Sequence, residues 1–562
     1  MKNSFLQQAT LLLKRLPGFL RHVLLHPEVH VTAASPNVVR FRNLEAPTRD
    51  GTILRLDAYR PKGDSSPRPV ILSAHPYGKD NLPERKAGIW KICSQYRMFR
   101  MPAPVHFSSF TGWEAPDPVC WVNAGYVVVN LDLRGAGQSD GLWNPLTVQE
   151  GEDVYDVIEW IAQQPWCDGH IGMLGVSYLA ISQYQAAALN PPHLKAICPW
   201  EGFSDLYRDF ARPGGILENG FLKLWSSLNA KMSRTEVDLF ALFSAHQLDD
   251  ETYKIRRAAL EEIRAPMLVC GSFSDHCLHS RGSLEAFRRV GSPQKWLWTH
   301  RGGKWSSFYS AEAFSDQLAF FDYFLKGANN GWASRPAVRL CTADGEAPGQ
   351  ERIEHLESFP PVDVKPTSYW LTAQGKLSQQ APGSSATLSW PEAQSNISWT
   401  ISFAQTVTFS GPMELMLNLK VDAEDLDLFV AVGKWRNGRR VGYEGSFGFD
   451  QDFITHGQLR LSQREIDPER SAPCAPVLRH QQHLPIKQGE LLQVRIPLLS
   501  SSTRFHPGEM LKLQLHRRWF FPRQPVSGQF PASYEQCNKP CTVTIQTGGQ
   551  NSSALICPQR SC

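Results

Sequence analysis

The sequence has little excess charge of either sign and no long uninterrupted hydrophobic run. Its 562 residues carry 58 Lys and Arg against 54 Asp and Glu, a formal net charge of +4, without a long basic segment. Nucleic acid is therefore not an expected partner, because such binding depends on neutralising phosphates. The apolar stretches are too short or too interrupted to span a bilayer, so we expect no integral membrane segment.

Cysteines are few and scattered, with 12 in the chain and no dense disulfide framework. The first 34 residues contain an apolar pattern that is interrupted by Lys and Arg and is not followed by a small-residue cleavage site. We interpret residues 1–34 as an N-terminal amphipathic segment that docks on its own protein, on a partner subunit of a homo-oligomer or on a membrane surface. Without an export signal, the thiols are expected to be reduced and the protein cytoplasmic.

Motifs for common cofactors and metals are also missing. There is no G-x-x-x-x-G-K-[ST] or H-E-x-x-H motif, and Arg134-Gly-Ala-Gly137 lacks the spacing of a dinucleotide-binding loop. Two groupings could in principle hold a metal but have unusual spacing or suit a solvated turn: Cys537, Cys541, Cys557 and Cys562, and His480-Gln-Gln-His483. We therefore expect neither a cofactor nor a metal.

The hydrophobic pattern divides the chain into regions of different character. Short apolar strands alternate with amphipathic helices in residues 35–200 and 266–332, which predicts a parallel sheet covered on both faces. Residues 201–265 are helical in pattern and interrupt this alternation as an inserted cap. Residues 333–562 carry many short alternating runs between Pro, Gly and Ser turns, which predicts an all-β jelly-roll sandwich.

Ser177 lies between a predicted strand and a predicted helix, in Gly175-Val-Ser-Tyr-Leu-Ala180. A glycine two residues before the serine suits a sharp, strained turn in which a bulkier side chain would clash. Such a strand-to-helix turn lifts a serine hydroxyl clear of the sheet and presents it as a nucleophile. The usual G-x-S-x-G pattern has a second glycine where this chain has Leu179.

A serine nucleophile needs a histidine to take its proton and a carboxylate to orient that histidine. In the chain order serine, acid, histidine, the acid and the base follow later strands of the sheet. Asp275 and His300 each follow one of these predicted strands, so we predict the triad Ser177, Asp275 and His300. His276 and His279 are rival bases, but both lie too close in sequence to Asp275 to sit on a separate loop.

Acyl transfer also requires donors for the negatively charged oxygen that develops on the substrate. The amide of Tyr178, in the first turn of the helix after Ser177, is one candidate. The hydroxyl of Tyr77, after an early strand, is the other.

Several ordered motifs together carry a resemblance to a known family. They are Pro76-Tyr77, Asp132-Leu-Arg-Gly-Ala-Gly-Gln-Ser-Asp-Gly141, Glu152–Ile161, Pro165-Trp-Cys-Asp-Gly-His-Ile-Gly172, Gly175–Ala180 and Val421–Val430. The chain resembles the cocaine esterase-like (CocE/NonD) hydrolases, relatives of X-prolyl dipeptidyl peptidases and α-amino-acid ester hydrolases. This resemblance implies an α/β-hydrolase domain with a helical cap, followed by a jelly-roll domain.

The resemblance also implies roles for individual residues. It implies Ser177 as nucleophile, Asp275 as acid, and the Tyr178 amide and Tyr77 hydroxyl as the oxyanion hole. Many members read Gly-Pro-Trp-x-His at the base, whereas this chain reads Trp298-Thr-His300 without the Gly-Pro.

The expected function is therefore that of a serine hydrolase acting on a small-molecule ester through a covalent acyl-enzyme, with an amide or X-Pro peptide as the less favoured substrate. Two alternatives stay open from sequence. One is an acyltransferase with the same residues, and the other is a catalytically silent binding protein that uses its jelly roll.

Overall fold

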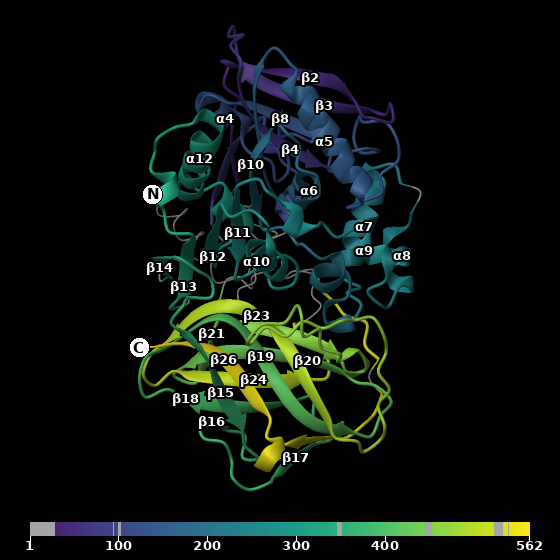
Figure 1. Ribbon diagram of the computed structural model, residues 1–562, viewed down its shortest axis with the longest axis vertical. Helices are drawn as coiled ribbons and strands as arrows, with labels where there is room; N and C mark the ends of the chain where they lie inside the picture. Colours follow the sequence, from purple (N-terminus) through teal and green to yellow (C-terminus); the bar gives the residue numbers. More distant parts are fainter. Residues whose placement is uncertain are drawn as a thin grey trace, which may run out of the picture.

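The computed structural model describes residues 29–561 except 94, 99–102, 236, 346–350, 444, 446–451, 522–531 and 538. An α/β domain occupies one end of the molecule and a β-sandwich the other (Figure 1). Most of the predicted N-terminal amphipathic segment, residues 1–28, lies outside the described residues.

The α/β domain is built on one twisted sheet whose central strands are parallel. Its strands, in spatial order, are β2 (Val38–Pro47), β3 (Ile53–Pro61), β8 (Val127–Asp132), β4 (Arg68–His75), β9 (Cys167–Val176), β10 (Leu194–Trp200), β11 (Met267–Ser272), β12 (Lys295–His300), β13 (Val338–Ala343) and β14 (Glu351–Leu356). The central strand β8, Val-Val-Val-Asn-Leu-Asp, is buried along its whole length, as a strand covered on both faces must be.

The predicted boundary near residue 333 does not coincide with the edge of this sheet. Strand β13 lies beyond that boundary, yet it pairs in parallel with β12 and so extends the first sheet. A short alternating strand looks the same in sequence whichever sheet it joins, so the pattern alone could not assign it.

Helices cover both faces of the sheet. On one face lie α5 (Val148–Ala162), α6 (Tyr178–Ala187) and α10 (Ser280–Arg289), and on the other lie α4 (Pro118–Asn123) and α12 (Ala311–Lys326) (Figure 1). Helix α5 turns Val154, Val157, Ile158 and Ile161 toward the sheet at helical spacing. Helix α6 is buried on every side, because the cap and α5 cover the faces that the sheet does not.

The cap contains α7 (Phe221–Met232), α8 (Leu239–Ala245) and α9 (Glu251–Lys254). Its rings Phe210 and Trp225 lie 5.7 Å apart, and Trp225 stacks on Tyr178 at the start of α6 with ring centres 6.3 Å apart. The cap thereby covers the sheet edge at which Ser177 lies.

The β-sandwich packs two sheets around a separate apolar core. One sheet contains β15 (Val364–Leu371), β16 (Leu377–Ser378), β17 (Thr387–Trp390), β19 (Val407–Val421), β23 (Leu492–Phe505), β25 (Val543–Gln546) and β26 (Ala554–Arg560); the other contains β18 (Asn396–Ser402), β20 (Asp427–Arg436), β21 (Arg439–Val441), β22 (Thr455–Arg460) and β24 (Met510–His516). The remaining strands and α-helices of the described residues are β1 (Val29–Thr32), β5 (Glu84–Lys86), β6 (Ile89–Lys91), α3 (Gln95–Met98), β7 (Val105–Ser108) and α11 (Lys304–Phe308).

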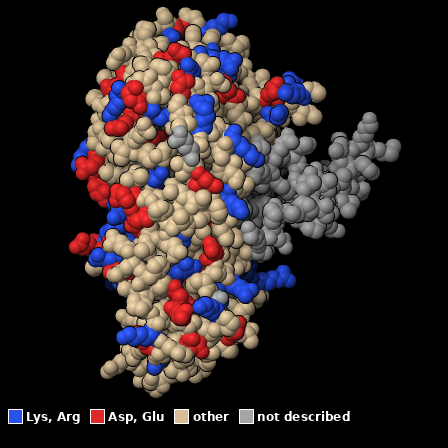
Figure 2. Space-filling view, turned by 90° about the vertical axis from the view of Figure 1, so that its right-hand side faces the viewer, with Lys and Arg blue, Asp and Glu red and all other residues tan. Residues whose placement is uncertain are grey.

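The surface carries charges of both signs, interspersed over the face that Figure 2 shows. Among the residues described, none of the helices combines the length and the apolar character needed to cross a membrane.

Candidate active site

Ser177 stands at the turn between β9 and α6, in a backbone conformation that few residues adopt. Its φ is 60° and its ψ −116°, a strained combination for a residue with a side chain. Gly175 is required beside it, since a Cβ there would lie 2.4 Å from the Cβ of Leu179. The amide of Ser177 donates to Trp200 O at 3.0 Å, which ties the turn to β10. These features form the sharp strand-to-helix turn that the sequence predicts.

The imidazole that contacts Ser177 belongs to His279. Ser177 Oγ lies 3.2 Å from His279 Nε2, and His279 Nδ1 bonds Asp275 Oδ2. Residues 275–279 form a turn in which the carbonyl of Asp275 accepts from the amides of Leu278 and His279 at 3.2 and 3.1 Å. Such a turn brings side chains four residues apart to the same side, so the carboxylate and the imidazole come from one short loop.

His300 was the predicted base, and the structure contradicts that prediction. Strand β12 continues through His300, so the side chain follows the period of two and joins Trp298 and Trp200 on the face covered by α12. There its Nε2 bonds Glu201 Oε1 at 2.9 Å and its Nδ1 lies 3.0 Å from Ser307 Oγ. The other rival, His276, points toward the β-sandwich, with Nδ1 3.3 Å from Asp452 Oδ2.

A lysine completes the polar group around the base. Lys304 begins α11 and is fully buried, with Nζ 2.9 Å from both Asp275 Oδ2 and His279 Nδ1. Burial opposes the charge of Asp275, but Lys304 and His279 outweigh it and lower the pKa of that carboxyl. Burial and the charge of Lys304 also lower the pKa of His279. The imidazole is thereby kept neutral, the form in which Nε2 can accept a proton.

We predict that Lys304→Met will move the acid limb of the kcat/KM profile to higher pH. Loss of the ammonium removes a like charge beside the imidazole, so the pKa of His279 rises and the neutral base forms only at higher pH. The expected shift is roughly one to three pH units. The matched control Lys304→Arg keeps the charge and should retain the limb near its original position. If Lys304→Met lowers kcat but leaves the acid limb of the kcat/KM profile where it was, Lys304 has only a structural role.

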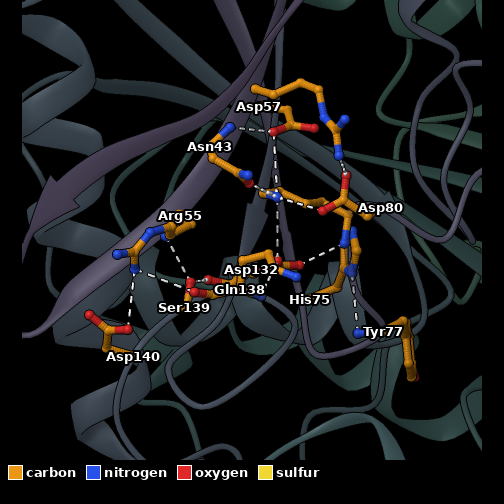
Figure 3. Close-up of polar contacts among 12 residues, drawn as sticks. Asn43, Arg55, Asp57, His75, Tyr77, Asp80, Asp132, Gln138, Ser139 and Asp140 are labelled. Carbon is orange, nitrogen blue, oxygen red and sulfur yellow. Dashed lines mark hydrogen bonds and ion pairs between the residues drawn. The ribbon is translucent and has the colours of Figure 1, made fainter.

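Tyr77 is held by a loop that a buried ionic network fixes in place. Figure 3 shows this network between the loop after β4 and the segment after β8. The amides of Lys79 and Gln138 donate to the carboxylate of Asp132 at 2.6 and 2.9 Å. Gly137 allows this approach, because a Cβ there would lie 2.2 Å from Asp132 Oδ2. The Asp132–Gly141 motif therefore has a structural reason: it anchors the loop that carries Tyr77.

Comparison with known proteins places this arrangement in a family. Residues 50–238 match the model of the X-Pro dipeptidyl-peptidase (S15 family), and residues 330–555 match the X-Pro dipeptidyl-peptidase C-terminal non-catalytic domain. A CocE/NonD family hydrolase from Staphylococcus aureus is 34% identical, with a TM-score of 0.87 over 93% of this chain and 94% of that one. The chain belongs to the CocE/NonD hydrolase family.

More distant relatives are also hydrolases by name. Cocaine esterase from Rhodococcus sp. is 26% identical over 92% of this chain and 98% of its own length. An α-amino acid ester hydrolase of 16% identity has the same fold, with a TM-score of 0.68 over 93% of this chain and 97% of that one. The chain is therefore a serine hydrolase, and the predicted fold class, an α/β-hydrolase domain with an inserted cap and a C-terminal jelly roll, is confirmed.

In this CocE/NonD hydrolase the pocket over Ser177 is predominantly apolar. Its walls come from the cap, α6 and the loops around them and include Tyr77, Trp113, Phe203, Phe210, Phe221, Leu224, Trp225, Leu228, Met232 and Trp305. Glu114 is the one carboxylate among the described lining residues, and its Oε1 accepts from Trp305 Nε1 at 3.1 Å. Burial raises the pKa of Glu114 to about 8, so the group is protonated at neutral pH.

One group of described residues has the composition of a metal site. Glu201, Cys270 and His300 offer donor atoms within 4.8 Å of one another. However, Glu201 and His300 bond each other directly, and burial raises the pKa of the Cys270 thiol well above its usual value. A thiol rather than a thiolate is a poor metal ligand, so this group is better described as a buried hydrogen-bonded cluster.

From sequence, Lys304 and Glu114 are not singled out, and His279 is named only as a rival base, because the acid and the base are placed on separate loops. The spacing of four residues in Asp275-His-Cys-Leu-His279, directly before a predicted helix, was the signal that could have identified it. Lys304 begins the short helix α11 and Glu114 stands in a loop; neither position has a special sequence pattern, and only the tertiary structure brings them to Ser177.

Proposed function

We propose that this serine hydrolase cleaves small-molecule carboxylic esters through an acyl-enzyme formed on Ser177. The contact of Ser177 Oγ with His279 Nε2 at 3.2 Å, with His279 bonded in turn to Asp275, carries the proposal. Because Nδ1–H donates to Asp275, Nε2 is left as the acceptor for the serine proton.

The proposed reaction has two halves. Ser177 Oγ attacks the ester carbonyl carbon while its proton passes to His279 Nε2, and the imidazolium then protonates the departing alkoxide. Water next attacks the acyl-enzyme with His279 as base, which releases the acid and restores the serine. In both halves the Tyr178 amide and the Tyr77 hydroxyl donate to the developing oxyanion.

The lining of the pocket supports an ester with an apolar, aromatic-compatible acyl or alcohol group. Aromatic and aliphatic side chains surround Ser177, and the one described carboxyl among them, Glu114, is protonated at neutral pH. An X-Pro peptide substrate carries a free ammonium group, which needs an ionised carboxylate as its partner when it is buried. An ester is therefore favoured over an X-Pro peptide. The relative from Rhodococcus is likewise an esterase by name. The few, scattered cysteines of the sequence favour an intracellular setting for this reaction.

A fluorophosphonate probe tests the proposal, because it reacts only with an activated serine. Wild-type protein should be labelled at one residue, and Ser177→Ala should not be labelled. Hydrolysis of 4-nitrophenyl acetate, butyrate and benzoate should yield the free acid even when a competing alcohol is present. Unlabelled wild-type protein would favour a silent binding protein, and a dominant exchanged ester would favour an acyltransferase.

A further inference from the structure

A second and larger cavity lies between the two domains, behind the turn that carries Asp275 and His279. Its volume is about 440 Å³. The cap contributes Arg208, the α/β domain contributes Arg281 and Arg288, and the sandwich domain contributes Arg470. Leu278 lines both this cavity and the pocket over Ser177.

The charges that line this cavity are predominantly positive. Four arginines face two acidic residues, Asp209 and Glu285, among the described lining residues. Three of the arginines are neutralised by carboxylates.

The paired arginines can be named with their partners. Arg208 pairs with Asp249 at 2.6 Å, Arg288 pairs with Glu285 at 2.7 Å, and Arg281 pairs with Asp209.

Arg470 differs from the other three. Its guanidinium makes no hydrogen bond or ion pair with any residue in the described part of the chain. Burial and the charge of Arg208 outweigh the opposing charge of Asp205 and lower the pKa of Arg470 to about 10, so it remains charged at neutral pH. Asp205 and Glu261 act on this half-buried guanidinium only through their charge, without direct contact, so its N–H groups are available to an anion that enters the cavity.

The remaining walls are mostly apolar, with His276, Gln458, Ser500 and Tyr534 as the polar side chains among the described lining residues. Proline rings recur on both sides of the cavity, together with aliphatic and aromatic side chains: Pro213, Phe359, Pro360, Pro361, Leu284, Pro412, Pro473, Pro476, Pro497, Leu498 and Pro558. Proline has no backbone N–H to offer, so these walls suit an apolar body rather than a polar one.

We propose that this cavity binds a small organic monoanion, a carboxylate carried on an apolar body, with Arg470 as the partner of the carboxylate. A guanidinium matches a carboxylate in a planar, two-pronged geometry. A single unpaired cation balances one negative charge, which favours a carboxylate over a phosphate dianion. This site is distinct from the Ser177 pocket and does not depend on the proposed esterase activity.

Calorimetric titration of the Ser177→Ala protein tests the proposal, since this variant separates binding from turnover. The probe is 4-phenylbutanoate, its uncharged counterpart is 4-phenylbutanamide, and the second anion is inorganic phosphate. We expect the carboxylate to bind with a stoichiometry of one, and both the amide and phosphate to bind at least tenfold more weakly.

Arginine variants made in the Ser177→Ala background then locate the site. Arg470→Gln should weaken carboxylate binding at least tenfold, and Arg470→Lys, which keeps the charge, should retain more affinity than Gln. The matched control is Arg439→Gln, an exposed arginine of the same domain outside the cavity. No carboxylate binding, equal affinity after Arg470→Gln, or tighter binding of phosphate would each overturn the proposal. Because Arg470 leaves no described partner behind, its variants should fold, which their thermal midpoints will check.

Discussion

Replacing His279 by glutamine should lower kcat for ester hydrolysis by roughly 10⁴-fold or more, the scale of losing the base of a serine triad. Glutamine keeps a polar side chain of similar length but cannot take the proton of Ser177. Burst kinetics with a 4-nitrophenyl ester would locate the loss in acylation, because that step first requires the proton transfer. Labelling by the fluorophosphonate should slow in parallel.

His300→Gln is the matched variant for this experiment. Both imidazoles are buried and both bond a carboxylate, but only His279 contacts the serine. Glutamine can still donate to Glu201, so we expect kcat within about tenfold of wild type, with any loss seen as a lower thermal midpoint. The reverse result, an active His279→Gln and an inactive His300→Gln, would contradict the assignment of the base.

Tyr77→Phe should lower kcat by about 10²–10³, the usual effect of removing one oxyanion donor. Burial raises the pKa of Tyr77 well above its usual value, so the hydroxyl keeps its hydrogen and can donate it to the substrate. The phenyl ring still fills its place among the pocket aromatics, so KM should change less than kcat.

Tyr126→Phe serves as the control for loss of a tyrosine hydroxyl. Tyr126 donates to Asp322 at 2.7 Å on the opposite face of the sheet, away from Ser177. Its removal should affect stability but leave kcat near wild type. Equal losses in both variants would indicate that Tyr77 acts through general packing and not through the oxyanion.

The sequence predicted those features that local pattern encodes. Gly175 and Ser177 identified the turn because its strain restricts the residue types allowed there. His300 was assigned wrongly because one further residue of strand β12 turns an exposed loop side chain into a buried one on the far face. A strand end is uncertain by at least one residue from pattern alone, and one residue is enough to reverse the side.

Other parts of the site depend on contacts between distant segments. Lys304 reaches Asp275 from the start of α11, after a different strand, and Glu114 reaches the pocket from a loop between two early elements. Neither Lys304 nor Glu114 belongs to a periodic sequence pattern that would have identified it. The pairing of β13 with β12 across the predicted domain boundary was likewise not predictable from sequence. An alternating apolar pattern predicts that a strand exists but not which strand it pairs with.

The turn at residues 275–279 reduces the number of separate chain segments that must be aligned for the proposed proton transfer, compared with a carboxylate and an imidazole on two different loops. Asp275 and His279 lie on the same turn, so the distance between their side chains is set by the local backbone geometry and not by how two loops pack together. Thermal loosening after β12 would then disturb the lysine before it disturbed the dyad. Among the three proposed catalytic side chains, the distance that depends on the packing of separate segments is the one between Ser177 Oγ and His279 Nε2.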